Sequence, residues 1–213
     1  MATIIQWESG TIADAGGTVQ GDVQEWTQGA YRWAAMPGDT SAAERLIWDV
    51  SATPSYALRL YAVMPRAWSV TNVDLMRASQ SGVQGSAIAL PGVGDGGRIT
   101  FRDAAGTRGQ SDVGLLHHGQ IARLEVLVDA DAQTMRAGVF GLGTDQPIYD
   151  TGPQPATVEP APTRFAAGHF VNTDSLARMA IGSIRVDDDP GSWIGRAPAD
   201  DGTPSPVTVI GTT

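Results

Sequence analysis

Apolar and polar residues alternate in two consecutive runs between Gly119 and Gly143. In the first run the apolar row is Ala122, Leu124, Val126 and Val128, and the polar row is Arg123, Glu125 and Asp129. Alternation with a period of two places the two rows on opposite faces of a β-strand. Residues 129–133 then have the composition of a turn, and alternation resumes over residues 134–139. The pattern predicts a central β-hairpin with one face in a core and with Glu125 and Asp129 on a solvated face.

The clearest single strand is predicted over residues 55–64, whose sequence is SYALRLYAVM. One of its faces is apolar throughout and consists of Tyr56, Leu58, Leu60, Ala62 and Met64. The other face combines Arg59 and Tyr61 with small apolar residues. A mixed face of this kind is expected where another strand, a loop or a partner covers part of a sheet. Pro65 ends the strand because it has no N–H to donate to a neighbour.

Shorter strands are predicted on both sides of these two features. They cover residues 3–7, 43–50, 73–79, 86–90, 98–103, 146–150, 164–171 and 178–186. Glycine-containing turns separate many of them, and the run from Gly92 to Gly97 is predicted to be one such turn. Helix is expected only as a turn or two, over residues 40–45 and 173–178. This succession predicts an all-β fold, a sandwich or a barrel, and not alternating strands and helices.

Composition narrows the range of functions. The 213 residues carry a formal net charge of -9, which repels nucleic-acid phosphates and anionic membranes, so neither is an expected partner. The chain has no Cys, which excludes disulfides and thiolate metal sites. The first residues lack the features of a signal peptide, and no apolar run has the length of a membrane span. We therefore expect synthesis in the cytoplasm, one domain over residues 1–196 and a tail over residues 197–213.

Six segments of the chain, taken in order, resemble a known family. They are SYALRLYAVMP, VDLMRASQSG, GSAIAL, GRITFRDAAG, GQIARLEVLVDADAQTMRAGVFG and IGSIRVDDDPGSWIG. Their succession, from about Ala43 to Gly195, resembles the concanavalin A-like, laminin-G-like jelly roll, in particular the versions found among virion structural proteins of tailed phages of actinobacteria. The resemblance implies a two-sheet antiparallel jelly-roll sandwich.

The same resemblance implies a function and a location. The implied function is that of a non-enzymatic virion component, either a minor tail protein or a protein that decorates the capsid exterior. The expected location is therefore the virion, the expected partners are other virion proteins, and a contribution to host-surface attachment is an additional expectation.

The sequence lacks the catalytic pattern of the glycanases that share this fold. Those enzymes carry two Glu and one Asp on one strand, so that one carboxylate attacks and another donates a proton. The five Glu of this chain, in contrast, are widely separated from one another. His117 and His118 are adjacent, so that in a strand they would point in opposite directions, and no serine lies in a G-x-S-x-G setting. A hydrolase is the least favoured function, and we expect a protein that is not an enzyme.

Aromatic residues offer a second functional hypothesis, a lectin-like carbohydrate-binding module. Trp26, Tyr31 and Trp33 lie close together in the sequence, and Trp68 follows later. Exposed aromatic rings of this kind stack on sugar rings, and a host cell-wall glycan is the expected ligand. The alternative is that these side chains are core residues or cover the edge of a sandwich, and the sequence favours this alternative for most of them.

Three consecutive aspartates, Asp187, Asp188 and Asp189, precede Pro190 and Gly191. Carboxylate oxygens are suitable calcium ligands, and laminin-G-like domains often bind calcium at one rim of the sandwich. A capped Asp-Pro-Gly turn is the competing and favoured interpretation. No cofactor is therefore expected, and calcium is kept as the one candidate.

The end of the chain suggests assembly. Pro204 to Pro206 stiffens the departure from the domain, and Val207 to Ile210 is a β-prone segment that would be an unprotected edge if it stood alone. It pairs either with its own domain or with a neighbouring copy. We expect a homo-oligomer, and we favour a trimer by analogy with phage surface proteins.

Overall fold

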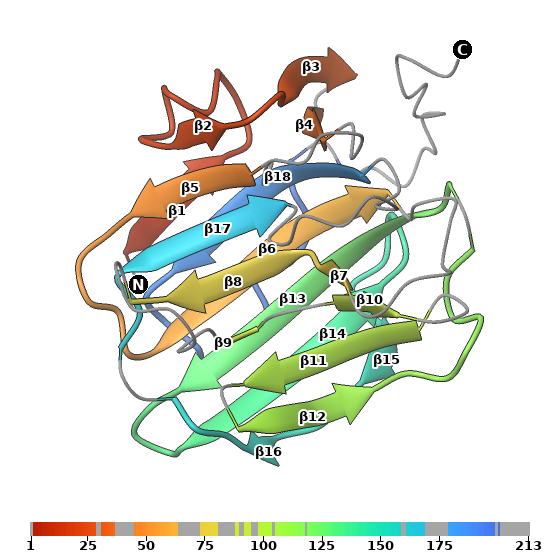
Figure 1. The fold of residues 1–213 in the computed structure, drawn as a ribbon. Helices are drawn as coiled ribbons and strands as arrows, with labels where there is room; N and C mark the ends of the chain where they lie inside the picture. Colours follow the sequence, from red (N-terminus) through yellow and green to blue (C-terminus); the bar gives the residue numbers. More distant parts are fainter. Residues whose placement is uncertain are drawn as a thin grey trace.

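Figure 1 shows the computed structural model, an all-β fold in two layers. It describes residues 2–28, 31–36, 45–63, 73–80, 88–89, 92–94, 98–103, 105–117, 119–158, 161–168, 179–198 and 200. Every strand pair among them is antiparallel, and none of these residues is helical. Consequently no segment of the described chain is a helix that could span a bilayer. The predicted fold class, an antiparallel two-sheet sandwich, is confirmed.

The first layer is a nine-stranded sheet with the described strand order β15-β14-β13-β6-β18-β4-β3, in which β1 also pairs with β18 and β16 with β14. Its strands are β1 (Thr3–Trp7), β3 (Gln24–Gln28), β4 (Tyr31–Met36), β6 (Tyr56–Val63), β13 (Ile121–Asp129), β14 (Thr134–Phe140), β15 (Pro147–Asp150), β16 (Gln154–Pro155) and β18 (Met179–Asp187). The predicted hairpin is present as β13 and β14, but β6 occupies the middle of the sheet, between β13 and β18.

The second layer consists of two smaller sheets that lie in front of the large sheet in Figure 1. One has the order β2-β5-β17-β8-β9 and the other the order β12-β11-β10-β7. Their strands are β2 (Thr18–Gln20), β5 (Arg45–Asp49), β7 (Val73–Asp74), β8 (Met76–Ser79), β9 (Ile88–Ala89), β10 (Gly92–Gly94), β11 (Arg98–Asp103), β12 (Gly106–Gln110) and β17 (Arg164–Gly168).

The main core lies between the two layers and is formed by the apolar rows that the sequence pattern predicted. Leu58 and Leu60 of β6 and Leu124 and Val126 of β13 are all fully buried there. The layers meet through contacts such as the edge-to-face pair of Tyr56 on β6 and Phe165 on β17, whose ring centroids are 5.1 Å apart. Burial of each large apolar side chain contributes about 1.5–3 kcal/mol to stability.

Two sequence predictions about local structure have different outcomes. Gly92–Gly94 was predicted to be a turn, but it is strand β10, paired with β7 and β11. The reason is that the hydrogen-bonded ladder uses main-chain groups, which glycine has like any other residue. The short helical turns expected at 40–45 and 173–178 fall on residues that, except for Arg45 in β5, lie outside the described part of the chain.

A bulge in β18 fixes where this strand meets its neighbours. The pairing register of β18 with β6 shifts between Gly182 and Arg185, and Ser183 has a φ of 45°. Gly182 lies against β4 so closely that a Cβ atom there would be 1.9 Å from the carbonyl oxygen of Arg32. Glycine is therefore required at this point of the sheet.

Candidate functional site

The outer face of the nine-stranded sheet, which points away from the main core, carries an unusual set of side chains. Two rows of paired residues run across neighbouring strands on this face. One row consists of Gly138, Glu125, Arg59 and Arg185, and the other of Phe140, Arg123, Tyr61, Gly182 and Trp33. Arg59, Arg123, Glu125 and Tyr61 are all no more than 1% exposed. The sequence prediction that Glu125 lies on a solvated face is therefore wrong.

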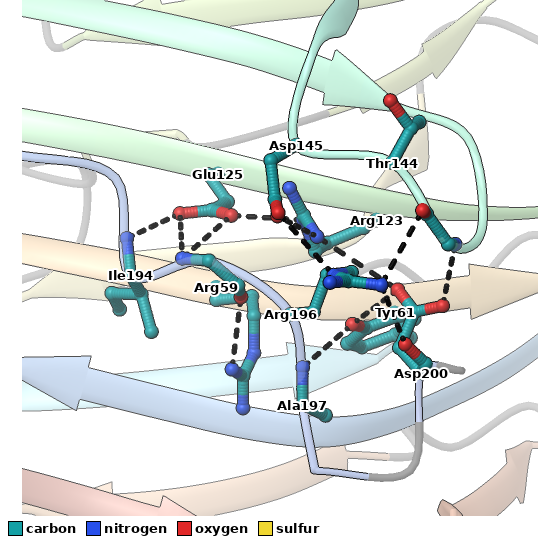
Figure 2. A network of polar contacts seen from close by, with 12 residues as sticks. Arg59, Tyr61, Arg123, Glu125, Thr144, Asp145, Ile194, Arg196, Ala197 and Asp200 are labelled. Atoms are coloured by element: carbon teal, nitrogen blue, oxygen red, sulfur yellow. Dashed lines mark hydrogen bonds and ion pairs between the residues drawn. The ribbon is translucent and has the colours of Figure 1, made fainter. Parts of the chain in front are cut away.

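These side chains are buried because a segment without regular secondary structure lies across them (Figure 2). We call this segment, residues 193–198 and 200, the strap. Glu125 accepts hydrogen bonds from the N–H groups of Ile194 at 2.6 Å and Gly195 at 3.2 Å. Arg59 donates to the carbonyl oxygen of Gly195 at 3.0 Å. The φ of Gly195, 83°, favours glycine at this position of the strap.

The far end of the strap is held by Tyr61. Its hydroxyl donates to a carboxylate oxygen of Asp200 at 2.9 Å and accepts from the N–H of Ala197 at 2.9 Å. The N–H of Gly143, in the loop after β14, donates to the other oxygen of Asp200 at 2.6 Å. Ala197 and Asp200 are both at least 95% buried. Ala197 and Asp200 are therefore packed against the sandwich through Tyr61 and the loop after β14.

Arg123 is a fully buried cation at the centre of the site under the strap. Its Nε lies 2.9 Å from Glu125, and its Nη1 lies 3.5 Å from Asp145 and 3.8 Å from Asp200. None of its three nitrogens makes a hydrogen bond of good geometry to any described residue. The guanidinium also lies over the ring of Phe140, 4.3 Å from the centroid. Ion pairs and the aromatic ring thus offset the desolvation of this cation.

Glu125 has a strongly shifted pKa. Burial raises the pKa of this carboxyl to about 7, because desolvation disfavours the charged form. Arg123, the two strap N–H groups and Arg59 oppose this rise, since each of them favours the carboxylate. Buried carboxyls with such a pKa are candidates for acid–base chemistry. Here, however, both oxygens are already engaged by the strap and Arg123.

The aromatic residues singled out in the sequence form a continuous cluster beside this site. Trp26 stacks on Trp33 with centroids 6.3 Å apart, and Tyr31 contacts both Trp33 and Tyr61. Trp33 is 1% exposed and Tyr31 6% exposed, so neither ring is open to a sugar, and both take the alternative role of core and edge cover. Trp26 is half-buried on the edge strand β3 and keeps part of its surface open. Trp68 lies outside the described residues.

The three aspartates proposed as calcium ligands have separate partners. Asp187 is buried and pairs with Arg185 at 3.0 Å, while Asp188 accepts a hydrogen bond from the N–H of Ala2 at 2.5 Å. Asp189 accepts from the N–H of Gly191 at 2.8 Å, as a turn cap does. Among the described residues no group of three or more metal-binding side chains converges. The geometry is that of a capped turn next to an ion pair.

Comparison with known proteins gives the fold. No protein-family model and no curated protein sequence matches the chain. Solved structures do match: botulinum neurotoxin type C has a TM-score of 0.59 at 7% identity over 87% of this chain and 47% of that chain. Trypanosoma rangeli sialidase has a TM-score of 0.61 at 12% identity, and the match covers 87% of this chain and 30% of the sialidase chain. A Shewanella oneidensis protein of unknown function has a TM-score of 0.55 at 10% identity, and the match covers 86% of this chain and 85% of that protein.

These matches show that the chain shares a β-sandwich fold with these proteins. The chain spans less than half the length of the toxin and sialidase chains but most of the Shewanella protein. At these identities the likeness concerns the fold alone.

Sequence reasoning missed the strap, although it identified most of the strands beneath it. The hydrophobic alternation of β6 and β13 correctly placed Arg59, Tyr61, Arg123 and Glu125 on the face away from the main core. The mixed composition of the β6 face correctly indicated partial cover. The strap, which covers it, has no periodic pattern and comes from a distant part of the sequence. The available signal was the pair Arg123 and Glu125, two opposite charges at alternate positions of one strand.

Proposed function

We propose that the protein is a non-enzymatic structural and binding module of a phage virion, either a minor tail protein or a protein of the capsid exterior. The observation that supports the non-enzymatic part is the state of Glu125, whose two oxygens both face strap N–H groups. A carboxylate that acts on a substrate needs an open position beside it. Here the strap takes that position, so the outer face holds a segment of the chain in place.

The virion part of the proposal is supported by the sequence resemblance over residues 43–195. Mass spectrometry of purified particles tests it directly, with immunogold labelling to separate tail from capsid. We expect the protein in constant stoichiometry with the other virion proteins. Its absence from particles that are otherwise complete would overturn this proposal.

The non-enzymatic part has its own test. Purified protein is incubated with cell-wall glycans of the host, and the release of reducing sugar is measured for the wild type and for Glu125→Gln. We expect no release by either protein. Release by the wild type that the substitution abolishes would make Glu125 a catalytic residue and would contradict the proposal.

A lectin-like carbohydrate-binding module is the second candidate function. Two observations favour it: Trp26 is only half-buried on an edge strand, and cell entry of a fold neighbour, botulinum neurotoxin type C, depends on interaction with two ganglioside molecules. The two functions are compatible, because a virion surface protein that binds a wall glycan would be both.

A glycan array of bacterial wall polysaccharides tests the second candidate. If it is correct, Trp26→Ala reduces binding at least tenfold because a stacked ring is lost. Val19→Ala is the matched control, since Val19 is also an exposed apolar residue of an edge strand, 45% exposed on β2. Binding that survives Trp26→Ala, or no binding to any glycan, would remove this candidate.

We also propose that the protein assembles, as a homo-oligomer or on a larger lattice, with a trimer favoured by analogy. The β-prone segment 207–210, which lies outside the described residues, would provide the contact. Light scattering of the full chain and of a chain lacking residues 203–213 tests this. A monomeric full chain, or an oligomer that the deletion leaves unchanged, would contradict it.

A further inference from the structure

Strand β3 ends the nine-stranded sheet on one side and lies at the margin of the fold (Figure 1). Its one strand partner among the described residues is β4. The other edge of β3 therefore presents main-chain N–H and C=O groups that no described strand pairs. An edge of this kind can add a further strand, and proteins protect most of their edges with short strands, prolines or bulges.

The other edge strands of the described sheets carry these protections. β2, β7, β9 and β16 have two or three residues each. β15 begins with Pro147, and β1 and β12 each shift register along their partner strands. β3, in contrast, has five residues, none of them proline, and it pairs with β4 in unbroken register. Within the described part of the chain, β3 is the edge that is ready for a partner strand.

An aromatic row leads to this edge across the outer face of the sheet. Tyr61 contacts Tyr31, and Tyr31 contacts Trp33. Trp33 in turn stacks on Trp26, with ring centroids 6.3 Å apart. The row ends on β3, where Trp26 is only half-buried, whereas Trp33 on β4 is 1% exposed. A further strand with an aromatic ring opposite Trp26 would continue the row.

The sequence of β3 is suited to pair with itself. In two antiparallel copies related by a two-fold axis at residue 26, Trp26 lies opposite Trp26 of the second copy, and Glu25 lies opposite Thr27. The two Glu25 side chains are then diagonal neighbours, so like charges do not face each other directly. Arg32 donates a hydrogen bond to Thr27, so that Glu25 of the second copy would come next to a cation. This pairing is complementary both in charge and in its aromatic rings.

We propose that β3 is a self-association edge: two copies of the chain pair their β3 strands antiparallel about Trp26 and join their nine-stranded sheets into one. The proposal names a surface for the self-assembly proposed above, and it rests on that assembly only in requiring a second copy. It uses no residue of segment 207–210, so either contact can fail while the other holds. Pairing also covers Trp26, so that a paired copy does not offer this ring to a glycan.

The contact is small. Two five-residue strands form an interface at the low end of the size range, below about 1,200 Å² of buried surface. We therefore expect a weak dimer, with a Kd in the micromolar range or weaker. Its occupancy rises wherever copies are held at high local concentration.

Light scattering of the full chain over a series of concentrations tests the contact. In Trp26→Lys two ammonium groups would lie opposite each other at the axis, so the Kd should rise at least tenfold. Val19→Lys is the matched control, because it places the same charge on the edge strand β2, where Val19 is 45% exposed, and it should keep the wild-type Kd. Equal masses for the wild type and Trp26→Lys at every concentration would overturn the proposal.

Cross-linking of the full chain identifies the pairing itself. The chain has no Cys, so a cysteine introduced at one position is its only thiol. Oxidation should link two copies of Trp26→Cys, whereas the thiols of two paired Gln24→Cys copies stay roughly 14 Å apart along the strands and should not react. If segment 207–210 or a strand of another protein occupies this edge instead, Trp26→Cys does not form a linked dimer, and the proposal is wrong.

The wild type decides the matter if the substitutions at Trp26 prevent folding. Hydrogen exchange of the full chain is then measured at increasing protein concentration. The protection of β3 amides should increase with concentration, while that of β2 amides stays constant. Protection of β3 that does not depend on concentration would overturn the proposal.

Discussion

Arg123 illustrates how one buried charge depends on its neighbours. It has no exposed surface, and the carboxylates of Glu125, Asp145 and Asp200 lie within 4 Å of its nitrogens. The desolvation penalty for such a cation is several kcal/mol, and attraction to the carboxylates repays it only while all of them remain in place. Removal of Arg123 leaves the buried carboxyls of Glu125 and Asp200 without their cation, whereas Asp145 is exposed to water.

Arg123→Met should therefore lower the free energy of unfolding by about 3–5 kcal/mol. The double variant Arg123→Met, Glu125→Gln should recover part of this loss, since one of the stranded charges is then absent. Arg164→Met is the control: Arg164 pairs with Asp49 in a bidentate contact on the surface, and its loss should cost less than about 1 kcal/mol. Urea unfolding gives all three values, and equal costs for Arg123→Met and Arg164→Met would contradict the buried ion-pair account.

Glu125 also gives the global stability an unusual dependence on pH. The pKa of a freely solvated glutamate is 4.5, whereas that of Glu125 is about 7 in the folded protein, chiefly because of burial. The folded state therefore binds more protons between these values, and stability falls as the pH rises through them. Relative to Glu125→Gln, the wild type should lose roughly 1–3 kcal/mol of unfolding free energy between pH 5 and pH 7.5.

The measurement is urea unfolding of both proteins at a series of pH values. Arginine partners lower the pKa values of Asp49 and Asp150 in the folded protein. These two aspartates make stability rise with pH, but only at a lower pH, where they become protonated. Parallel stability curves for the two proteins between pH 5 and pH 7.5 would show that Glu125 is not the titrating group.

At the scale of strands, the sequence identified those elements whose side chains differ on their two faces. β6 and β13 were predicted nearly to the residue because each places one apolar row in the core. β10 and β12 were missed, since Gly92, Gly94, Gly106 and Gly109 leave no such row. Backbone hydrogen bonds to neighbouring strands define these two elements, and a pattern of side chains does not report them.

Gly182 provides a test at this scale. Gly182→Ala would place a Cβ atom 1.9 Å from the carbonyl oxygen of Arg32, so that β4 and β18 must separate. We expect a loss of roughly 3 kcal/mol in unfolding free energy, the upper end of the usual cost of overpacking. Gly141→Ala is the control, because its Cβ would meet only the methyl carbon of Thr144 at 3.5 Å and should cost less than about 1 kcal/mol. Similar thermal melts for the two variants would be evidence against the tight approach.

For the whole molecule, the strand pattern predicted an all-β sandwich or barrel, the family resemblance implied a two-sheet antiparallel sandwich, and the structure agrees with the sandwich. The site on the outer face was not predictable in the same way. It depends on contacts between residues far apart in the chain, such as Glu125 with Ile194 and Tyr61 with Asp200. The side chains of the site were located on the correct face, but their burial results from tertiary structure that local patterns do not encode.

The absence of a shared site for Asp187, Asp188 and Asp189 leads to a prediction for the intact protein. Each of these carboxylates already has its own partner, Arg185, Ala2 and Gly191 respectively. Dialysis against a chelator should therefore leave the midpoint of thermal unfolding unchanged, and added calcium should not raise it. A midpoint that falls with the chelator and recovers with calcium, but not with magnesium, would establish a calcium site instead.

Apart from the carboxylate of Asp200, the strap is held by hydrogen bonds to its main chain, since Glu125, Arg59 and Tyr61 bind the N–H and C=O groups of Ile194, Gly195 and Ala197. Such contacts are indifferent to the identity of most strap side chains. Substitutions at Ile194, which is half-buried, and at Pro198, which is exposed, leave these hydrogen bonds available. The strap can therefore diverge in sequence, or carry a grafted epitope at these two positions, while Gly195 and the side chains beneath it preserve where it lies.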